Sequence, residues 1–105
     1  MAKTIGEVLL DEVSNYLDIT WTQSDAEKSK LKGQIDRAAA SIRGKLGYCD
    51  FIGNTQEKGL LFIMVMYDRA GRVDEFWTNY RGEILSLQVR KRVEREEAIR
   101  NASQD

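Results

Sequence analysis

The sequence predicts an all-α fold, a small bundle of three main helices followed by a short fourth helix and a charged C-terminal tail. Three observations support this prediction. The 105 residues include no proline, which suits helices joined by short loops. Apolar residues recur at helical spacing along the first half of the chain. Several segments also begin with a Ser, Thr or Asn that is followed three positions later by Glu, the pattern of a helix-starting capping box.

The composition is that of one ordinary globular domain, with 42% hydrophobic and 31% charged residues. The chain has no histidine and a single cysteine, Cys49. Metal sites built on His, Ser-His or Cys-His nucleophiles and a disulfide within the chain are therefore not expected. No phosphate-binding glycine loop occurs, and no pair of carboxylates stands out from the others. We expect neither enzymatic activity nor a cofactor, and we expect Cys49 to be buried and idle.

No apolar run reaches the roughly 18 residues that a membrane span needs, and the opening residues lack the pattern of a signal peptide. We therefore expect no membrane association. The formal net charge is −1, so the chain as a whole is not drawn to nucleic acid.

The first helix is predicted from about Ile5 to Leu17. Thr4 and Glu7 form a capping-box pattern at its start. In the polar loop that follows, Trp21 either folds back over the core or serves as a docking aromatic. The predicted buried stripe of this helix consists of Ile5, Leu9, Val13, Tyr16 and Leu17.

The second helix begins near Asp25, because Ser24 and Glu27 repeat the capping-box pattern, and Gly47 is a natural stop. At ~1.5 Å per residue it would be roughly 30 Å long, and we expect it to be the longest core element. Its predicted buried stripe consists of Leu31, Ile35, Ala38, Ala39, Ile42 and Leu46.

The stretch from Leu60 to Tyr67 is apolar at every position. Such a run fits either a strand buried on both faces or a helix buried all round. The flanks favour a helix from about Thr55 to Ala70. Asn54 and Glu57 resemble a capping box before it, and Gly71 lies just past its basic last turn. A helix that is apolar on every side must be covered by other helices or by another subunit.

Phe76 and Tyr80 stand four positions apart and would share one face of a short fourth helix. Clustered aromatic residues in this region suit either an interface or a lid over the core. Further on, Leu85, Leu87 and Val89 alternate as in a short extended segment. The highly charged stretch after them could form i,i+4 ion pairs, which are too weak to hold an isolated helix. We therefore divide the chain into a helical domain, residues 1–89, and a flexible or partner-ordered tail, residues 90–105.

Charge is unevenly distributed along the first two helices. Residues 1–27 contain one lysine and six acidic residues, whereas residues 28–45 contain six basic residues and Asp36 alone as an acid. The bases spread round the whole polar arc of the second helix rather than along one line. They form either a solvated face beside an acidic neighbouring helix or a basic face for DNA or an acidic partner.

The order and spacing of several short patterns resemble a known class of viral protein. The first helix ends in VSNYLDI, residues 13–19, and a polar loop leads to the long second helix, residues 24–47. The apolar third helix ends in MYDR, residues 66–69, and Phe76, Tyr80, Ile84 and Leu87 follow it. This arrangement is similar to the head–tail connector proteins, also called adaptor or head-completion proteins, of long-tailed double-stranded DNA bacteriophages. The resemblance covers roughly residues 5–89 and leaves out the charged tail.

The resemblance implies an all-α structural protein of the virion, without enzymatic activity or a cofactor. Its subunits would form a ring, expected to be a dodecamer in the virion, between the portal protein and a tail or stopper protein. The ring would extend the DNA channel and complete the head after packaging, while DNA passes through without sequence-specific binding. The protein would be present in the host cytoplasm during assembly and at the head–tail interface of the virion afterwards.

Burial and charge, rather than matches to known contacts, select the candidate residues for these interactions. The candidates for contact between subunits are Phe62, Met66, Tyr67, Trp77 and Tyr80. The candidates for docking on the portal are Arg90, Lys91, Arg92 and Arg95 in the predicted tail. The alternative interpretation is a small helical DNA-binding regulatory protein, which the basic second helix allows. The neutral net charge and the long loop between the first two helices argue against it.

Overall fold

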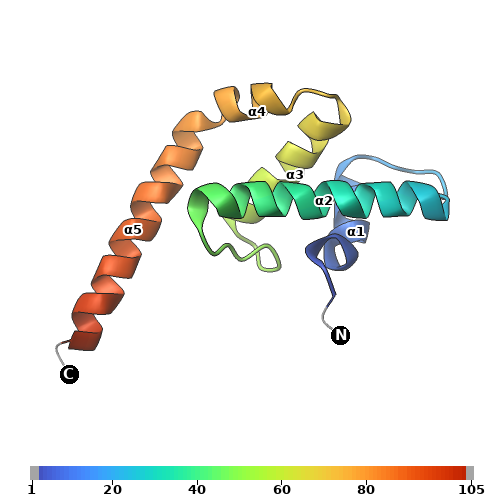
Figure 1. Ribbon diagram of the computed structural model, residues 1–105. Helices are drawn as coiled ribbons and strands as arrows, with labels where there is room; N and C mark the ends of the chain where they lie inside the picture. The colour runs from blue at the N-terminus through green and yellow to red at the C-terminus, as the bar shows by residue number, and fades with distance from the viewer. Residues whose placement is uncertain (1–2, 104–105) are drawn as a thin grey trace.

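The computed structural model describes residues 3–103, and this part of the chain consists of five α-helices without a strand (Figure 1). The all-α prediction is confirmed. The helices are α1 (Ile5–Tyr16), α2 (Asp25–Leu46), α3 (Gln56–Arg69), α4 (Val73–Asn79) and α5 (Arg81–Ser103).

The C-terminal region differs from the prediction. The segment expected to be extended, from Leu85 to Val89, and the stretch expected to be a flexible tail form a single long helix, α5. With 23 residues, α5 is one residue longer than α2, which was expected to be the longest core element. Residues 104 and 105 of the predicted tail lie outside the described residues.

Side-chain hydroxyls cap the starts of α1 and α2 as the sequence predicts. The Thr4 hydroxyl accepts a hydrogen bond from the Glu7 backbone N–H at 3.1 Å. At α2, the Ser24 hydroxyl accepts from the Glu27 N–H at 3.2 Å, and the Glu27 carboxylate accepts from the Ser24 N–H at 3.4 Å. This reciprocal pair is a complete capping box, and it fixes the start of α2 at Asp25.

The N-cap of α3 lies one residue after the predicted one. Thr55, and not Asn54, is the N-cap residue, and its hydroxyl accepts from the Lys58 N–H at 3.2 Å. The expected pairing of Asn54 with Glu57 was therefore wrong. Glu57 instead turns toward α5 and forms ion pairs there.

Two helices end in a hydrogen-bond pattern that needs a residue in the left-handed region of backbone space. At the end of α3, the Arg72 N–H donates to the Tyr67 carbonyl at 2.8 Å and the Gly71 N–H donates to the Asp68 carbonyl at 3.0 Å. Gly71, with φ of 72°, supplies that conformation without steric cost. Asp18, with φ of 57°, takes the same role after α1 although it has a Cβ atom.

Helices α1, α2 and α3 form the body of the protein, and α1 and α3 both pack against α2. The buried stripe predicted for α2 faces this core, as do Leu60, Leu61, Met64 and Val65 of α3, because residues three and four apart lie on one side of a helix. Phe51 and Cys49 from the α2–α3 loop, Phe76 from α4, and Ile84 and Leu87 from α5 complete it. The largest fully buried aliphatic side chains are Leu9, Leu31, Ile35, Ile42, Leu60, Leu61 and Leu87.

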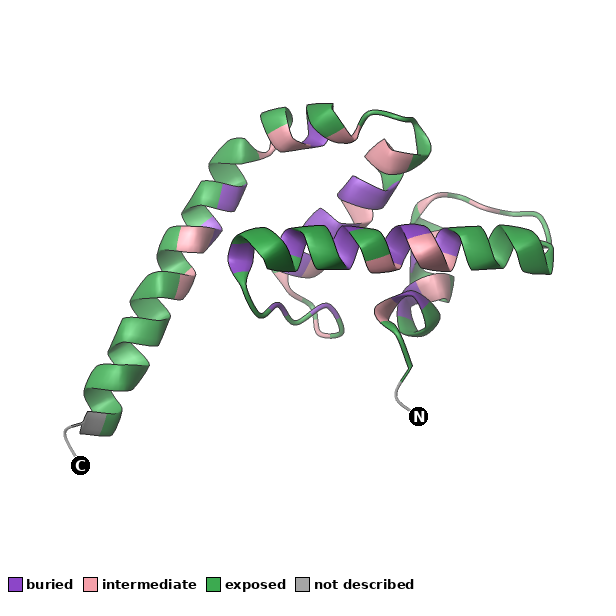
Figure 2. Ribbon diagram, in the orientation of Figure 1, coloured by how far each residue is buried: buried purple, intermediate pink, exposed green. Residues whose placement is uncertain are grey.

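Helix α4 carries the chain from the end of α3 to α5, which leaves the body as a long arm (Figure 1). Buried and intermediate positions are confined to the first half of α5, and the described positions after Lys91 are exposed (Figure 2). The Cα radius of gyration is 15.8 Å, compared with about 13 Å for a compact domain of this length. The protein is therefore elongated, with principal extents of 55 × 35 × 19 Å.

Candidate functional site

Four aromatic side chains form a cluster where α3, α4 and the start of α5 meet. The Phe76 ring is fully buried and lies 5.0 Å from the Trp77 ring, 5.3 Å from the Tyr80 ring and 6.0 Å from the Tyr67 ring, measured between centroids. Tyr67, Trp77 and Tyr80 are partly buried around it. Burial raises the pKa of the Tyr80 hydroxyl, and the neighbouring Tyr67 and Glu83 raise it further. The cluster covers this end of the core within one chain.

The five candidates for subunit contact therefore lie in different environments. Tyr67, Trp77 and Tyr80 belong to the aromatic cluster, in which ring contacts already occupy part of their surface. Phe62 is partly buried, and its ring lies 5.5 Å from that of Tyr16 on α1. Met66 is the one member of the five with a largely exposed side chain, at 43%. The structure thus brings three of the candidates together and leaves Met66 at the surface of α3.

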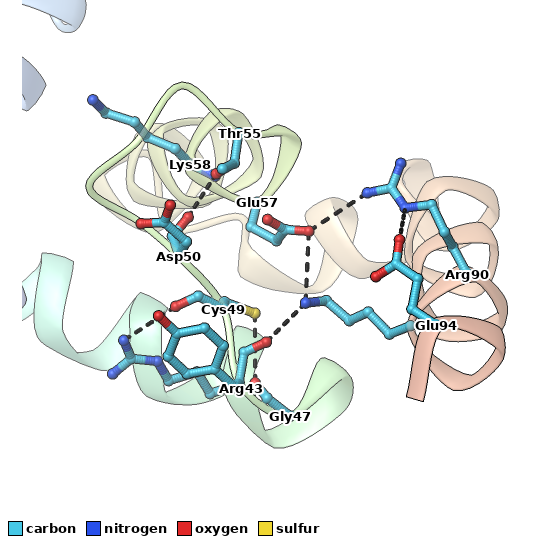
Figure 3. A network of polar contacts seen from close by, with 11 residues as sticks. Arg43, Gly47, Cys49, Asp50, Thr55, Glu57, Lys58, Arg90 and Glu94 are labelled. Atoms are coloured by element: carbon cyan, nitrogen blue, oxygen red, sulfur yellow. Dashed lines mark hydrogen bonds and ion pairs between the residues drawn. The ribbon is translucent and has the colours of Figure 1, made fainter. Parts of the chain in front are cut away.

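A buried carboxylate joins the middle of α5 to the start of α3 (Figure 3). Glu57 is 6% exposed, and Arg90 Nη2 and Lys91 Nζ each lie 3.7 Å from its Oε1. Lys91 Nζ also donates a hydrogen bond to the Tyr48 carbonyl oxygen at 2.7 Å. We call Glu57, Arg90 and Lys91 the α5 latch. Water screens ion pairs less in such a partly desolvated place, and removing one partner would leave the buried Glu57 carboxylate less well paired.

The C-terminal end of α2 gives α5 a second polar contact. Gln88 Nε2 donates to the Lys45 carbonyl oxygen at 2.9 Å, one of the last carbonyls of α2 that have no partner within the helix. With the buried side chains of Ile84 and Leu87 beside it, this contact holds the first half of α5 against the body.

The four candidates for portal docking fall into two pairs. Arg90 and Lys91 belong to the α5 latch, so part of their charge is used within the chain. Arg92 and Arg95 are exposed, and no ion pair within residues 3–103 engages either of them. Only the second pair is fully available to a partner.

Sequence reasoning missed an exposed apolar face on α5. Leu85, Val89 and Val93 follow one another at a spacing of four residues and are 51%, 52% and 47% exposed. In a helix this spacing places them on one side, and buried Ile84 and Leu87 mark a different side. The four-residue spacing of Leu85, Val89 and Val93 is present in the sequence. However, the alternation of Leu85, Leu87 and Val89 predicts an extended segment, in which these residues would not form this helical face.

A cavity of about 300 Å³ lies beside this face, between the end of α2, helix α4 and the start of α5. The Lys45 ammonium lies 5.8 Å from the centre of the Trp77 ring, one of the walls, a distance at which the cation and the ring attract one another. The remaining lining residues are Arg81, Ile84, Leu85 and Gln88.

Trp21 lies at the surface, whereas Cys49 is buried. Trp21 is 56% exposed, and its indole N–H donates to Glu27 Oε2 at 3.1 Å. It therefore does not fold over the core. This hydrogen bond and those from Ser24 hold the pKa of Glu27 below its ordinary value. Cys49 is 1% exposed, as expected, and burial raises the pKa of its thiol.

Among the described residues, no group of three or more Cys, Asp and Glu side chains is placed to hold a metal ion. The described helices likewise include none that combines the length and the apolar character required to cross a membrane.

Comparison of the chain with protein-family models, with curated proteins and with solved structures gives no match.

Proposed function

We propose that the chain is a structural virion protein that forms a ring between the portal and the tail of a long-tailed bacteriophage. The ring would extend the DNA channel, complete the head after packaging and let DNA pass without sequence-specific binding. The observation that carries this proposal is α5, a 23-residue helix that leaves the body and presents apolar and basic side chains to solvent. Such a surface gains free energy when a second molecule covers it.

Partly exposed apolar residues on α3 support contact between subunits. Met66 is exposed, and Phe62 is only partly covered by Tyr16 of α1. Both side chains lie four positions apart on α3 and can contact another subunit without disturbing the core. Tyr67, Trp77 and Tyr80 would contribute only the edges that their own cluster leaves exposed.

For portal docking, the proposal relies on Arg92 and Arg95 more than on Arg90 and Lys91. The latter two are already paired with Glu57. Because guanidinium groups bind carboxylates through paired hydrogen bonds, exposed arginines on the arm suit an acidic surface on the portal.

Light scattering on the purified protein, alone and mixed with the portal protein of the same genome, tests the proposal. We expect a species many times heavier than one 12.0 kDa chain, either in both samples or only on the portal. A monomer in both samples, with no elution together with the portal, would reject the connector function.

Substitutions in the arm test the docking residues. Arg95→Glu should weaken portal binding because it places a negative charge where an acidic partner surface is expected. Lys30→Glu is the matched control, since Lys30 is also exposed but lies in the first half of α2. Equal portal binding by both variants would remove Arg95 from the docking surface.

The alternative function, a DNA-binding regulator, retains one observation in its favour. Helix α2 exposes five basic side chains, although Arg37 lies 3.7 Å from Asp68 and Arg43 donates to the Cys49 carbonyl at 3.4 Å. The exposed bases are Lys28, Lys30, Arg37, Arg43 and Lys45. Binding to duplex DNA that weakens steeply with salt would favour this function, and no binding at low salt would exclude it.

A further inference from the structure

We infer that the exposed face of α5 packs against the exposed face of α1 in a second copy of the chain. This inference rests on the proposed ring and deepens it, because it names the two helix faces that meet.

The α5 face is apolar and basic. Leu85, Val89 and Val93 form its centre. Arg81 lies four positions before Leu85 and Arg92 lies seven positions after it, so both lie on the same side of the helix. No ion pair within residues 3–103 engages either arginine. The face therefore combines uncovered apolar surface with two unpaired arginines, and exposed Glu96, four positions after Arg92, adds one negative charge near its distal end.

The α1 face is apolar and acidic. Val8 and Tyr16 are 45% and 43% exposed, and Asp11 and Glu12 lie between them in the sequence. Glu12 forms an ion pair with Lys58 of α3. Asp11 is exposed and takes part in no ion pair of the described chain. Its charge is opposite to that of Arg81 and Arg92.

The two faces also match in length. Val8 and Tyr16 are eight positions apart, as are Leu85 and Val93, and eight positions correspond to a rise of about 12 Å in a helix. Opposite charges at the edges of two apolar patches favour their contact and fix its orientation. Pairing of α5 with α5 would instead bring four arginines and two Glu96 carboxylates to one interface, whose excess of positive charge disfavours it. The charge pattern therefore selects α1 as the partner of α5.

The two faces lie at different places on the subunit, so the same contact can be repeated from one copy of the chain to the next. Helix α1 is attached near the middle of α2, where the Gly6 N–H donates to Asp36 Oδ1 at 2.7 Å. Helix α5 is attached at the end of α2, where Gln88 bonds to Lys45. Since the faces are different parts of one subunit, each copy can bind one neighbour through α1 and another through α5. A contact of this type closes into a ring when its rotation allows.

Cysteine trapping tests which faces meet. Val8→Cys and Val89→Cys each replace an exposed side chain, and buried Cys49 remains as a common background. Equal amounts of the two variants are mixed at high concentration with diamide, which takes up the two electrons and two protons released when a disulfide forms. We expect a reducible dimer that contains one copy of each variant, and a ladder of larger species from the chain that carries both substitutions.

Three controls define the result. Wild-type protein reports any reaction of Cys49, and Ala40→Cys, at an exposed position of α2, replaces Val8→Cys as the matched control for random encounters. Val89→Cys alone reports pairing of α5 with α5. The inference is overturned if the Val8 and Val89 mixture gives no more dimer than the Ala40 mixture. It is also overturned if Val89→Cys alone reacts as fast as the mixture.

Charge exchange provides a second readout in the same assay. Asp11→Lys on the Val8→Cys chain, or Arg92→Glu on the Val89→Cys chain, should each slow dimer formation by about tenfold, because like charges then meet. When both substitutions are present, the opposite charges are restored and the rate should recover. A double variant as slow as the singles would show that Asp11 and Arg92 do not share an interface.

This experiment separates the inference from the connector function. Trapping between α1 and α5 without portal binding would retain the contact and reject the connector. Portal-bound rings whose subunits do not cross-link through these cysteines would retain the connector and reject the contact. If the contact is present, Arg92 is used within the ring and Arg95 is left to bind the portal.

Discussion

Gly6 lets α1 cross α2 at close range. A Cβ atom on Gly6 would lie 2.3 Å from the backbone carbonyl oxygen of Lys32, far inside van der Waals contact. The same close approach brings the Gly6 N–H to the Asp36 carboxylate. The absence of a Cβ atom at Gly6 thus allows the two helix backbones to approach closely. Glycine is needed here for space and not for its backbone freedom, because Gly6 has an ordinary helical conformation.

We predict that Gly6→Ala lowers the free energy of unfolding by about 1–3 kcal/mol, because the new methyl group forces α1 away from α2. Gly59→Ala in α3 is the matched control, since a Cβ atom there meets nothing within 4 Å. It should gain about 0.5–1 kcal/mol from reduced backbone entropy in the unfolded chain. Urea denaturation followed by circular dichroism measures both. Equal stability of the two variants would contradict the close contact.

Helix α5 shows how an element of low intrinsic stability is fixed by contacts with distant parts of the chain. Its apolar side chains are few and divided between two sides, so its own amphipathic character is weak. Ile84 and Leu87 bury one side against the core, and the α5 latch adds ion pairs to Glu57, more than 30 positions earlier in the sequence. The first half of the helix is therefore determined by packing rather than by local propensity.

We predict that Lys91→Met lowers the free energy of unfolding by about 0.5–1.5 kcal/mol, because it removes the hydrogen bond to the Tyr48 carbonyl and leaves Glu57 with Arg90 alone. Arg95→Met, on the exposed part of the same helix, should change stability by less than about 0.5 kcal/mol. Amide hydrogen exchange should also become faster in the first half of α5 when the latch is weakened. Unchanged exchange in Lys91→Met would mean that Ile84 and Leu87 suffice to hold the helix.

At the scale of the whole molecule, the protein consists of a packed body and an arm. The last buried residue of the described chain is Leu87, and beyond it Arg90 and Lys91 form ion pairs with Glu57. The distal part of α5 therefore contributes to shape more than to stability. It is the part of the chain from which a partner can gain most new buried surface.

We predict that deletion of residues 94–105 changes the free energy of unfolding by less than about 0.5 kcal/mol, because residues 94–102 are exposed and Arg90–Glu94 is a surface pair. The radius of gyration from small-angle X-ray scattering should fall toward that of a compact domain. Portal binding should be weakened if Arg95 contributes to it. A large loss of stability would show instead that the distal arm supports the body.

The sequence predicts correctly those parts of the fold that depend on interactions between residues close in the chain. The start of α2 follows from the capping box of Ser24 and Glu27, and the end of α3 follows from Gly71, because these interactions join residues only a few positions apart. The one-residue shift at α3 arose because Thr55 and Asn54 are both capable caps. In the structure the Thr55 hydroxyl caps the helix, and the Glu57 carboxylate is paired with Arg90 and Lys91 rather than with the start of its own helix.

The candidate site was less accessible from the sequence. The aromatic residues at positions 76, 77 and 80 were recognisable as a group, but whether they cover the core or face a partner depends on where α4 folds relative to α3. In the structure they contact one another, and Met66 remains the exposed candidate. The exposed face of Leu85, Val89 and Val93 could be identified only after α5 was known to be a helix.

The sequence by itself determined the all-α class, the bounds of α1 and α2 to within a residue, and the burial of Cys49. Capping, helical periodicity and stop signals act over less than two turns, so they can be recognised without the fold. Only the tertiary structure decided that residues 81–103 form one helix, which arginines are paired, and which apolar face is left uncovered. These features depend on contacts between residues distant in the chain, whose free energies outweigh weak local preferences.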